Sequence, residues 1–132
     1  MKQVLDTRFL FEYFYSADLE TQKKTTQKMK ELISKGNGIL PTIVVAEIVR
    51  VTCERRGKDM AESRYQALVQ SGLQVEGLTP QIAKAAGLIK SQHKGVPMGD
   101  CIIAATAIAN HARILSDDVH FDEITVAKRC WI

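Results

Sequence analysis

Short apolar runs alternate with longer amphipathic segments along this chain, a pattern that predicts strands separated by helices. The expected strands are residues 3–5, 39–40, 73–78, 113–115 and 124–126. Six helices are expected. The first follows Asp6, the second covers residues 19–35, and the third covers 42–56. The fourth runs from Asp59 to Gly72, the fifth begins at Pro80, and the last runs from Asp100 to Ala109. Because strands and helices alternate, we expect an α/β fold in which a mainly parallel sheet lies between two layers of helices.

Local signals set several of these helix boundaries. Gly36 follows a helical pattern and is expected to end it, whereas Thr42 is expected to cap the next helix. Asp59 and Glu62 have the spacing of a capping box. Thr79 followed by Pro80 combines an N-cap residue with proline at the first helical position, which is a strong helix start.

The most apolar segment is the last expected helix. Between Cys101 and Ala109 only Thr106 is polar, and a helix that is apolar on all sides is buried in a core. Asp100, at the start of this helix, therefore places a carboxylate where the core meets the surface.

Composition indicates one globular domain over residues 1–132, because 45% of the residues are hydrophobic and 25% are charged. The net charge of +3 and the pI of about 8.8 are compatible with a polyanionic partner without indicating one. The three cysteines form no CxxC pair, and no apolar run is long enough to span a bilayer. We therefore expect a cytoplasmic protein without a membrane segment.

Four acidic residues from distant segments are expected at one edge of the sheet. Asp6 follows the first strand, either Asp117 or Asp118 supplies the acid after the strand at 113–115, and Asp100 opens the helix that leads into that strand. Glu47 is the only charged residue of positions 43–49, in a helix that starts from the same edge. Parallel sheets bind ligands beyond the carboxyl ends of their strands, where the strand order reverses. This edge is therefore the candidate site.

Each acid also has a structural explanation. Asp6 and Asp100 could be helix N-caps, the acids at 117 and 118 could be solvated in a turn, and Glu47 could pair with Arg50. Their convergence favours a shared function, because carboxylates this close repel one another unless a cation neutralises them. Oxygen ligands without His or Cys at a zinc spacing indicate Mg²⁺ or Mn²⁺, and such a site suits metal-assisted phosphodiester hydrolysis.

Over essentially its whole length, the chain resembles PIN-domain proteins of the VapC toxin type. The resemblance rests on four segments in order, which are Val4-Leu5-Asp6-Thr7, the apolar helix from Thr42 to Ile48 around Glu47, the Ile- and Ala-rich helix after Asp100, and Ser116-Asp117-Asp118 before Phe121. It implies a five-stranded parallel sheet, a magnesium- or manganese-dependent endoribonuclease with RNA as substrate, and a homodimer. For toxins it also implies inhibition by a cognate antitoxin protein.

The resemblance also implies roles for individual residues. The carboxylates that would hold the metal or its waters are those of Asp6, Glu47, Asp100 and Asp118. Thr7 and Ser116 would orient them through hydroxyl hydrogen bonds. Asp117 stands where the family often has a basic or amide residue, so it could share or replace the role of Asp118.

Basic residues near the acids are candidates for contacting substrate. Arg8 and Arg50 each lie within a helical turn of a proposed ligand and could bind phosphate, the alternative being charge balance for the acids. Two other functions stay open, which are a non-catalytic PIN-fold binding or regulatory module and an RNA-processing nuclease that is not a toxin. The four acids disfavour the binding module, because such a module has no need of mutually repelling carboxylates.

Overall fold

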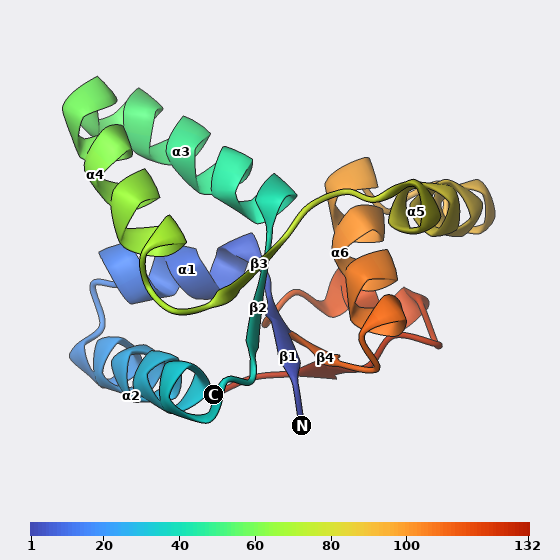
Figure 1. Cartoon of the computed structure of the whole chain (residues 1–132), viewed down its shortest axis with the longest axis horizontal. Coiled ribbons are helices and arrows are strands. Elements are labelled where there is room, and N and C mark those ends of the chain that lie inside the picture. Colours follow the sequence, from blue (N-terminus) through green and yellow to red (C-terminus); the bar gives the residue numbers. More distant parts are fainter.

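The computed structural model describes all residues from 1 to 132 and contains a five-stranded sheet with helices on both faces (Figure 1). The strands are β1 (Gln3–Leu5), β2 (Gly38–Pro41), β3 (Gln74–Glu76), β4 (Arg113–Leu115) and β5 (Arg129–Cys130). The helices are α1 (Thr7–Tyr15), α2 (Leu19–Lys35), α3 (Thr42–Arg56), α4 (Lys58–Val69), α5 (Pro80–Gln92) and α6 (Met98–Ala109), and a 3₁₀ helix, η1 (Val119–Glu123), precedes β5.

The sheet is parallel throughout, with the strand order β3-β2-β1-β4-β5. Val4 of the central strand pairs with Ile39 on one side and with Ile114 on the other. The chain moves outward from β1 through β2 to β3, then returns across the sheet to place β4 on the other side of β1. The strand order therefore reverses between β1 and β4, and the expected α/β architecture with five parallel strands is confirmed.

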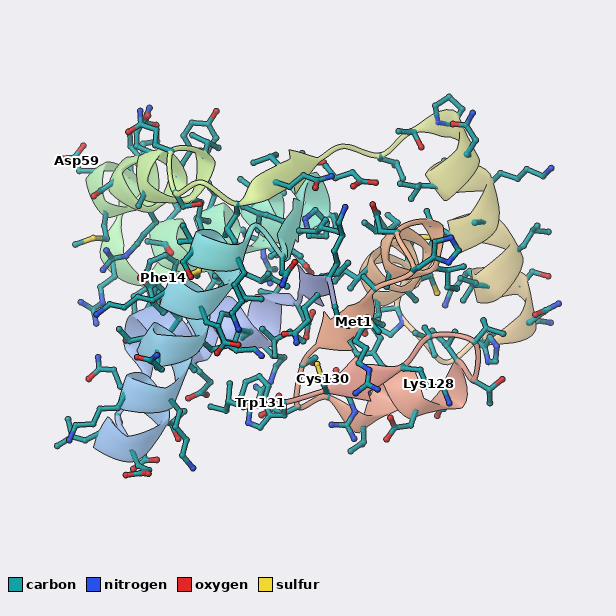
Figure 2. All side chains as sticks on the ribbon, turned by 60° about the horizontal axis from the view of Figure 1, so that its bottom comes forward. Met1, Phe14, Asp59, Lys128, Cys130 and Trp131 are labelled. Atoms are coloured by element: carbon teal, nitrogen blue, oxygen red, sulfur yellow. The ribbon has the colours of Figure 1, made fainter.

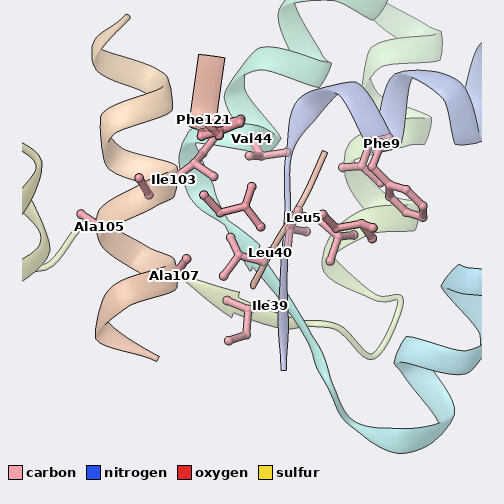
Figure 3. Packing of buried hydrophobic residues seen from close by; sticks show 14 of the residues in the cluster. Leu5, Phe9, Ile39, Leu40, Val44, Ile103, Ala105, Ala107 and Phe121 are labelled. Atoms are coloured by element: carbon pink, nitrogen blue, oxygen red, sulfur yellow. The ribbon is translucent and has the colours of Figure 1, made fainter. Parts of the chain in front are cut away.

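The core has apolar side chains on both faces of the sheet. Figure 1 shows α1, α2 and α4 on one side of the strands and α5 and α6 on the other. Trp131, directly after β5, lies beside α2 (Figure 2), and its ring meets that of Phe9 edge to face with centroids 6.2 Å apart. Figure 3 shows Phe9 on one side of the strands and Ile103 and Ala107 of α6 on the other, and these three residues are fully buried. The apolar helix expected from the sequence thus lies in the core.

The last strand was expected at residues 124–126, and this prediction is wrong. These residues form a bend and a turn, in which the Ala127 amide donates to the Ile124 carbonyl at 3.0 Å. Ile124 is apolar because it is buried against the core, whereas Val126 is 73% exposed. The chain completes this turn before β5 pairs with β4, where Arg129 lies opposite Ile114.

Three helices begin at other residues than their capping signals predict. α6 begins at Met98, two residues before Asp100, because the extended backbone of Pro97 supplies its N-cap. α3 takes Pro41 as its N-cap, so Thr42 is its first helical residue and does not cap it. α4 begins directly after Gly57 and includes Asp59, so the predicted capping box does not form. The expected cap of α5 is confirmed, since the Thr79 side chain accepts from the Ile82 amide at 3.2 Å.

None of the helices combines the length and the apolar character that a bilayer crossing requires.

Candidate active site

The carboxyl ends of β1 and β4 lie side by side at the point where the strand order reverses. The Asp6 amide, one residue beyond β1, donates to the carbonyl of Leu115 at 3.2 Å, so the two strand ends are joined by backbone hydrogen bonding. Ser116 and Asp118 follow β4 directly. The sheet therefore brings together residues that are more than a hundred positions apart in the sequence.

Ser116 connects Asp6 with the loop that carries Asp118. Its buried hydroxyl donates to Asp6 Oδ2 at 2.6 Å and accepts from the Asp118 amide at 3.0 Å. Asp6 occupies the N-cap position of α1, but its side chain makes no capping hydrogen bond, and only 3% of the residue is exposed. The Asp6 carboxylate is thus held mainly by Ser116, and the backbone amides of Thr7 and Arg8 at the start of α1 also favour its charged form.

Glu47 reaches the same edge from the second turn of α3. Its Oε1 accepts a hydrogen bond from the Thr7 hydroxyl at 2.7 Å, and no ion pair joins Glu47 to Arg50. A Cβ atom on Gly99 of α6 would lie 3.5 Å from Glu47 Oε2. The second turn of α3 and the first turn of α6 therefore meet at this carboxylate.

Asp100 and Asp118 form a cluster with His120. One ligand atom from each of these residues lies within 4.8 Å of the other two. Asp118 Oδ1 also accepts from the His120 amide at 2.9 Å and lies 3.3 Å from His120 Nδ1. Asp100 lies in the first turn of α6 and not at its N-cap position, so the interpretation of Asp100 as a simple N-cap is wrong.

The pKa values of Asp6 and Asp100 reflect both burial and the neighbouring acids. The pKa of Asp6 is raised to about 6, mainly by burial and to a smaller extent by Glu47, although the hydrogen bond from Ser116 offsets part of the rise. The pKa of Asp100 is also raised to about 6, first by burial and then by the charges of Asp6, Asp118 and Glu47. Carboxylic groups that lie close together without a cation are expected to keep their protons to a higher pH, because this reduces their mutual repulsion.

The Asp117 side chain pairs with an arginine, whereas that of its neighbour Asp118 lies in the acidic cluster. Arg8 donates to both carboxylate oxygens of Asp117, from Nε at 2.9 Å and from Nη2 at 3.1 Å. This two-pronged hydrogen bond lowers the pKa of Asp117. Arg50 is exposed on α3 and has no ion-pair partner.

Two residues at this edge were not among the site residues predicted from the sequence. His120 joins the acidic cluster because η1 begins at Val119 and turns the chain back toward Asp118. Arg129 donates to both oxygens of Asp122 and, from Nη1, to the Ser116 carbonyl at 3.4 Å. The sequence contained a signal for His120, which lies only two residues after Asp118. It contained no signal for Arg129, because the last strand was expected at earlier residues.

Comparison with known proteins identifies the family of this fold. The model of the PIN domain family matches residues 4–127. No match was found among functionally curated proteins.

Solved structures with the same fold include three from toxin–antitoxin systems. One is VapBC2 from Rickettsia felis bound to a DNA fragment from its promoter, with 16% identity and a TM-score of 0.80 over 99% of this chain and 98% of that one. A second is DNA-bound VapBC from Salmonella typhimurium, with 17% identity and a TM-score of 0.78 over 99% and 98%. The third is VapC20 from Mycobacterium tuberculosis, described as a toxin that cleaves the sarcin–ricin loop, with 16% identity and a TM-score of 0.71 over 93% and 95%.

Proposed function

The chain belongs to the PIN domain family, and from this premise we propose that it is a metal-dependent endoribonuclease that acts as the toxin of a toxin–antitoxin pair. The observation that carries the proposal is the convergence of four carboxylates on the switch point of the sheet. Asp6 and Asp100 have raised pKa values there, and neighbouring acids contribute to both. A fold gains no stability from acids that repel one another, so their assembly supports a function that needs them.

The donor atoms of this centre suit Mg²⁺ or Mn²⁺. Both ions prefer oxygen ligands, and the four acids supply carboxylate oxygens from four separate segments. His120 stands next to Asp118, but its side chain is 59% exposed, and an imidazole nitrogen suits Mg²⁺ or Mn²⁺ less well than carboxylate oxygens do. We therefore assign the cation to the carboxylates of Asp6, Glu47, Asp100 and Asp118, held directly or through water.

The fourth acid is assigned to Asp118 and not to Asp117. Arg8 already engages both oxygens of the Asp117 carboxylate. Asp118, by contrast, shares a cluster with Asp100. The Arg8–Asp117 pair then serves to fix the loop after β4, so that Asp118 faces the centre.

A bound divalent cation would activate water and offset the negative charge of the phosphate under attack. The chain's own residues keep the carboxylates in position for this chemistry. Ser116 holds Asp6 Oδ2, and Thr7 holds Glu47 Oε1, so a hydroxyl group fixes one oxygen of each carboxylate. Arg8 is 52% exposed at its side chain and retains a donor nitrogen, Nη1, that could contact a substrate phosphate.

The toxin assignment is supported by the fold likeness to VapBC complexes from two organisms. We therefore propose a cognate antitoxin protein as the partner of this chain, with a homodimer as its assembly. RNA is preferred as the substrate because one neighbour with this fold is described as a toxin that cleaves the sarcin–ricin loop.

Incubation of the purified protein with labelled single-stranded and structured RNAs tests this function. We expect cleavage in Mn²⁺ or Mg²⁺, none in EDTA, and none with Asp100→Asn. Asp59→Asn is the matched control, because it makes the same chemical change at an exposed residue at the outer end of the α3–α4 hairpin (Figure 2), and it should cleave normally. Cleavage that persists in EDTA, or at an unchanged rate in Asp100→Asn, contradicts the proposal.

A further inference from the structure

A basic and aromatic surface begins beside the acidic centre and extends along α1. We call it the arginine–aromatic surface, and it consists of Phe11, Phe14 and Tyr15 of α1, Arg55 and Arg56 at the end of α3, and Arg64 of α4. Figure 2 shows Phe14 where α1 meets the α3–α4 hairpin. None of its residues belongs to the site described above.

Each guanidinium of this surface lies over an aromatic ring. Arg55 Cζ is 4.9 Å from the centre of the Phe11 ring, and Arg64 Cζ is 4.8 Å from that of Phe14. Arg56 Cζ lies 5.6 Å from the Tyr15 ring, whose hydroxyl is in turn hydrogen-bonded to the buried Thr52 at 2.7 Å. The planar groups are therefore stacked and held in place, and they are not mobile side chains in solvent.

The three arginines have donors without partners. No carboxylate lies within 4.0 Å of Arg55, Arg56 or Arg64, although Arg8 and Arg129 are each paired with an aspartate. The Nε of Arg64 is buried and makes no hydrogen bond. Guanidinium groups placed together without counter-charges are suited to bind an anionic partner.

A hollow joins this surface to the acidic centre. It has a volume of about 300 Å³ and is lined by Thr7, Arg8, Phe11 and Arg55. Thr7 hydrogen-bonds Glu47, so the hollow extends from a residue that supports the acidic centre to the Phe11–Arg55 pair of the arginine–aromatic surface. An RNA strand bound for cleavage extends beyond the scissile bond. This hollow offers a path for that strand from the acidic centre to the arginine–aromatic surface.

We propose that the arginine–aromatic surface binds the single-stranded RNA that flanks the scissile bond, with phosphates on the arginines and bases stacked on the planar groups. This inference rests on the proposed ribonuclease function. A positively charged groove with aromatic platforms is the general means of binding single strands without sequence readout, and bases also stack on guanidinium planes. Stacking favours RNA over an acidic peptide, which offers charge without flat rings.

A second basic surface provides a matched control. Lys23, Lys24 and Lys28 of α2 line a hollow of about 440 Å³ together with Trp131. Like the arginine–aromatic surface, this surface combines cationic side chains with an aromatic ring. Its lining differs because it includes Glu31 and none of the site residues. Substituting two lysines here changes the net charge by the same amount as substituting two arginines there.

The test measures fluorescence anisotropy of a labelled single-stranded RNA of mixed sequence on the full chain carrying Asp100→Asn, so that no cleavage occurs. Arg55→Gln with Arg56→Gln is compared with Lys23→Gln with Lys28→Gln, and circular dichroism verifies that both fold. We expect the arginine pair to weaken binding roughly tenfold and to reduce the slope of log K against log salt by about 1.4, for two lost phosphate contacts. The lysine pair should change both values by much less.

Equal losses in the two double variants overturn the inference, because they would reflect net charge alone. Loss of binding to a poly-glutamate peptide, with RNA binding unchanged, also overturns it and assigns the surface to a protein partner. Failure of the ribonuclease function is recognised separately, by the absence of cleavage in the protein with Asp100 intact. RNA affinity sensitive to Arg55 and Arg56 in that case would leave the binding surface standing without the chemistry.

Discussion

At the scale of single residues, the site is built from pairs in which a hydroxyl fixes a carboxylate. Ser116 donates to Asp6, and Thr7 donates to Glu47, each within 2.7 Å. Such short hydrogen bonds to an acceptor that can carry charge are among the stronger ones in proteins. Two of the acids are thereby held in position, and at Asp6 the hydrogen bond acts against burial, which opposes the charge of the carboxylate.

The raised pKa of Asp100 predicts a stability that depends on pH in the absence of metal. Because its pKa is about 6 when folded and near 3.8 when unfolded, the native state binds this proton more tightly, and the free energy of unfolding falls as pH rises through 4 to 6. Asp100→Asn removes this loss and should be more stable than the original protein by roughly 1–3 kcal/mol at pH 7.5. Urea unfolding in EDTA at pH 5 and 7.5 measures the difference, and an advantage that does not grow with pH contradicts the account.

Ser116 should matter for both stability and activity. Ser116→Ala leaves Asp6 Oδ2 and the Asp118 amide without their buried partner, which should cost about 1–3 kcal/mol in the free energy of unfolding. We expect slower cleavage as well, because Asp6 and Asp118 lose their common support. Ser34→Ala, at an exposed position of α2, is the control and should change neither.

At the scale of elements, helices and strands were predicted correctly where the spacing of buried apolar residues matched the repeat of a helix or a strand. The all-apolar segment before Ala109 is a core helix, and β1 and β4 were placed correctly. The predicted last strand failed because Ile124 is buried in a turn, and a short apolar run does not distinguish a strand from a turn that packs on the core.

The four candidate acids could be singled out from the sequence for a related reason, because each interrupts or borders an apolar segment at the end of a strand or in a helix beside it. Which of Asp117 and Asp118 lies near Asp100 could not be predicted, because it depends on Arg8, which lies more than a hundred positions earlier and binds Asp117 beside the neighbouring strand end. The arginine–aromatic surface was also missed, since it combines one helix with a helical hairpin from another part of the chain.

Two glycines should respond in opposite directions to the same substitution. A Cβ on Gly38, at the start of β2, would clash with Leu73 Cδ2 and lie 3.2 Å from Leu32 Cβ, so Gly38→Ala should destabilise the protein by about 1–3 kcal/mol. Gly87 is exposed within α5 and has open space, so Gly87→Ala should stabilise it by roughly 0.5–1 kcal/mol. Denaturant titration of both variants checks the signs, and a stabilising Gly38→Ala would contradict the packing described between β2 and its neighbours.

At the scale of the whole molecule, strand order decides where the site can form. Because β1 and β4 are neighbours while their connections leave on opposite sides, the loops after them part and leave room at the carboxyl edge. Helices α3 and α6 then begin at this edge and add Glu47 and Asp100. The fold thus assembles four acids that the sequence separates.

This arrangement predicts that divalent cations stabilise the native protein as a whole. Mn²⁺ or Mg²⁺ bound only to the folded state should raise the Tm in proportion to the logarithm of its concentration. Thermal unfolding with 0 to about 10 mM metal measures this, and Asp100→Asn should show a smaller shift or none. An equal rise in the variant would mean that the ions bind elsewhere, which would refute a cation centre at the acids.

The most direct test of the central claim, that Asp6, Glu47, Asp100 and Asp118 form one cation-binding centre, is a crystal structure of the Mn²⁺-soaked protein with anomalous diffraction. We expect an anomalous peak at the carboxyl edge of β1 and β4, with Asp100 and Asp118 among its nearest residues and the Arg8–Asp117 pair intact beside it. A peak bound by Asp117 in place of Asp118 would overturn the assignment of the fourth acid. No peak at these carboxylates in millimolar Mn²⁺, at neutral pH and in an open lattice, would contradict the proposed centre itself.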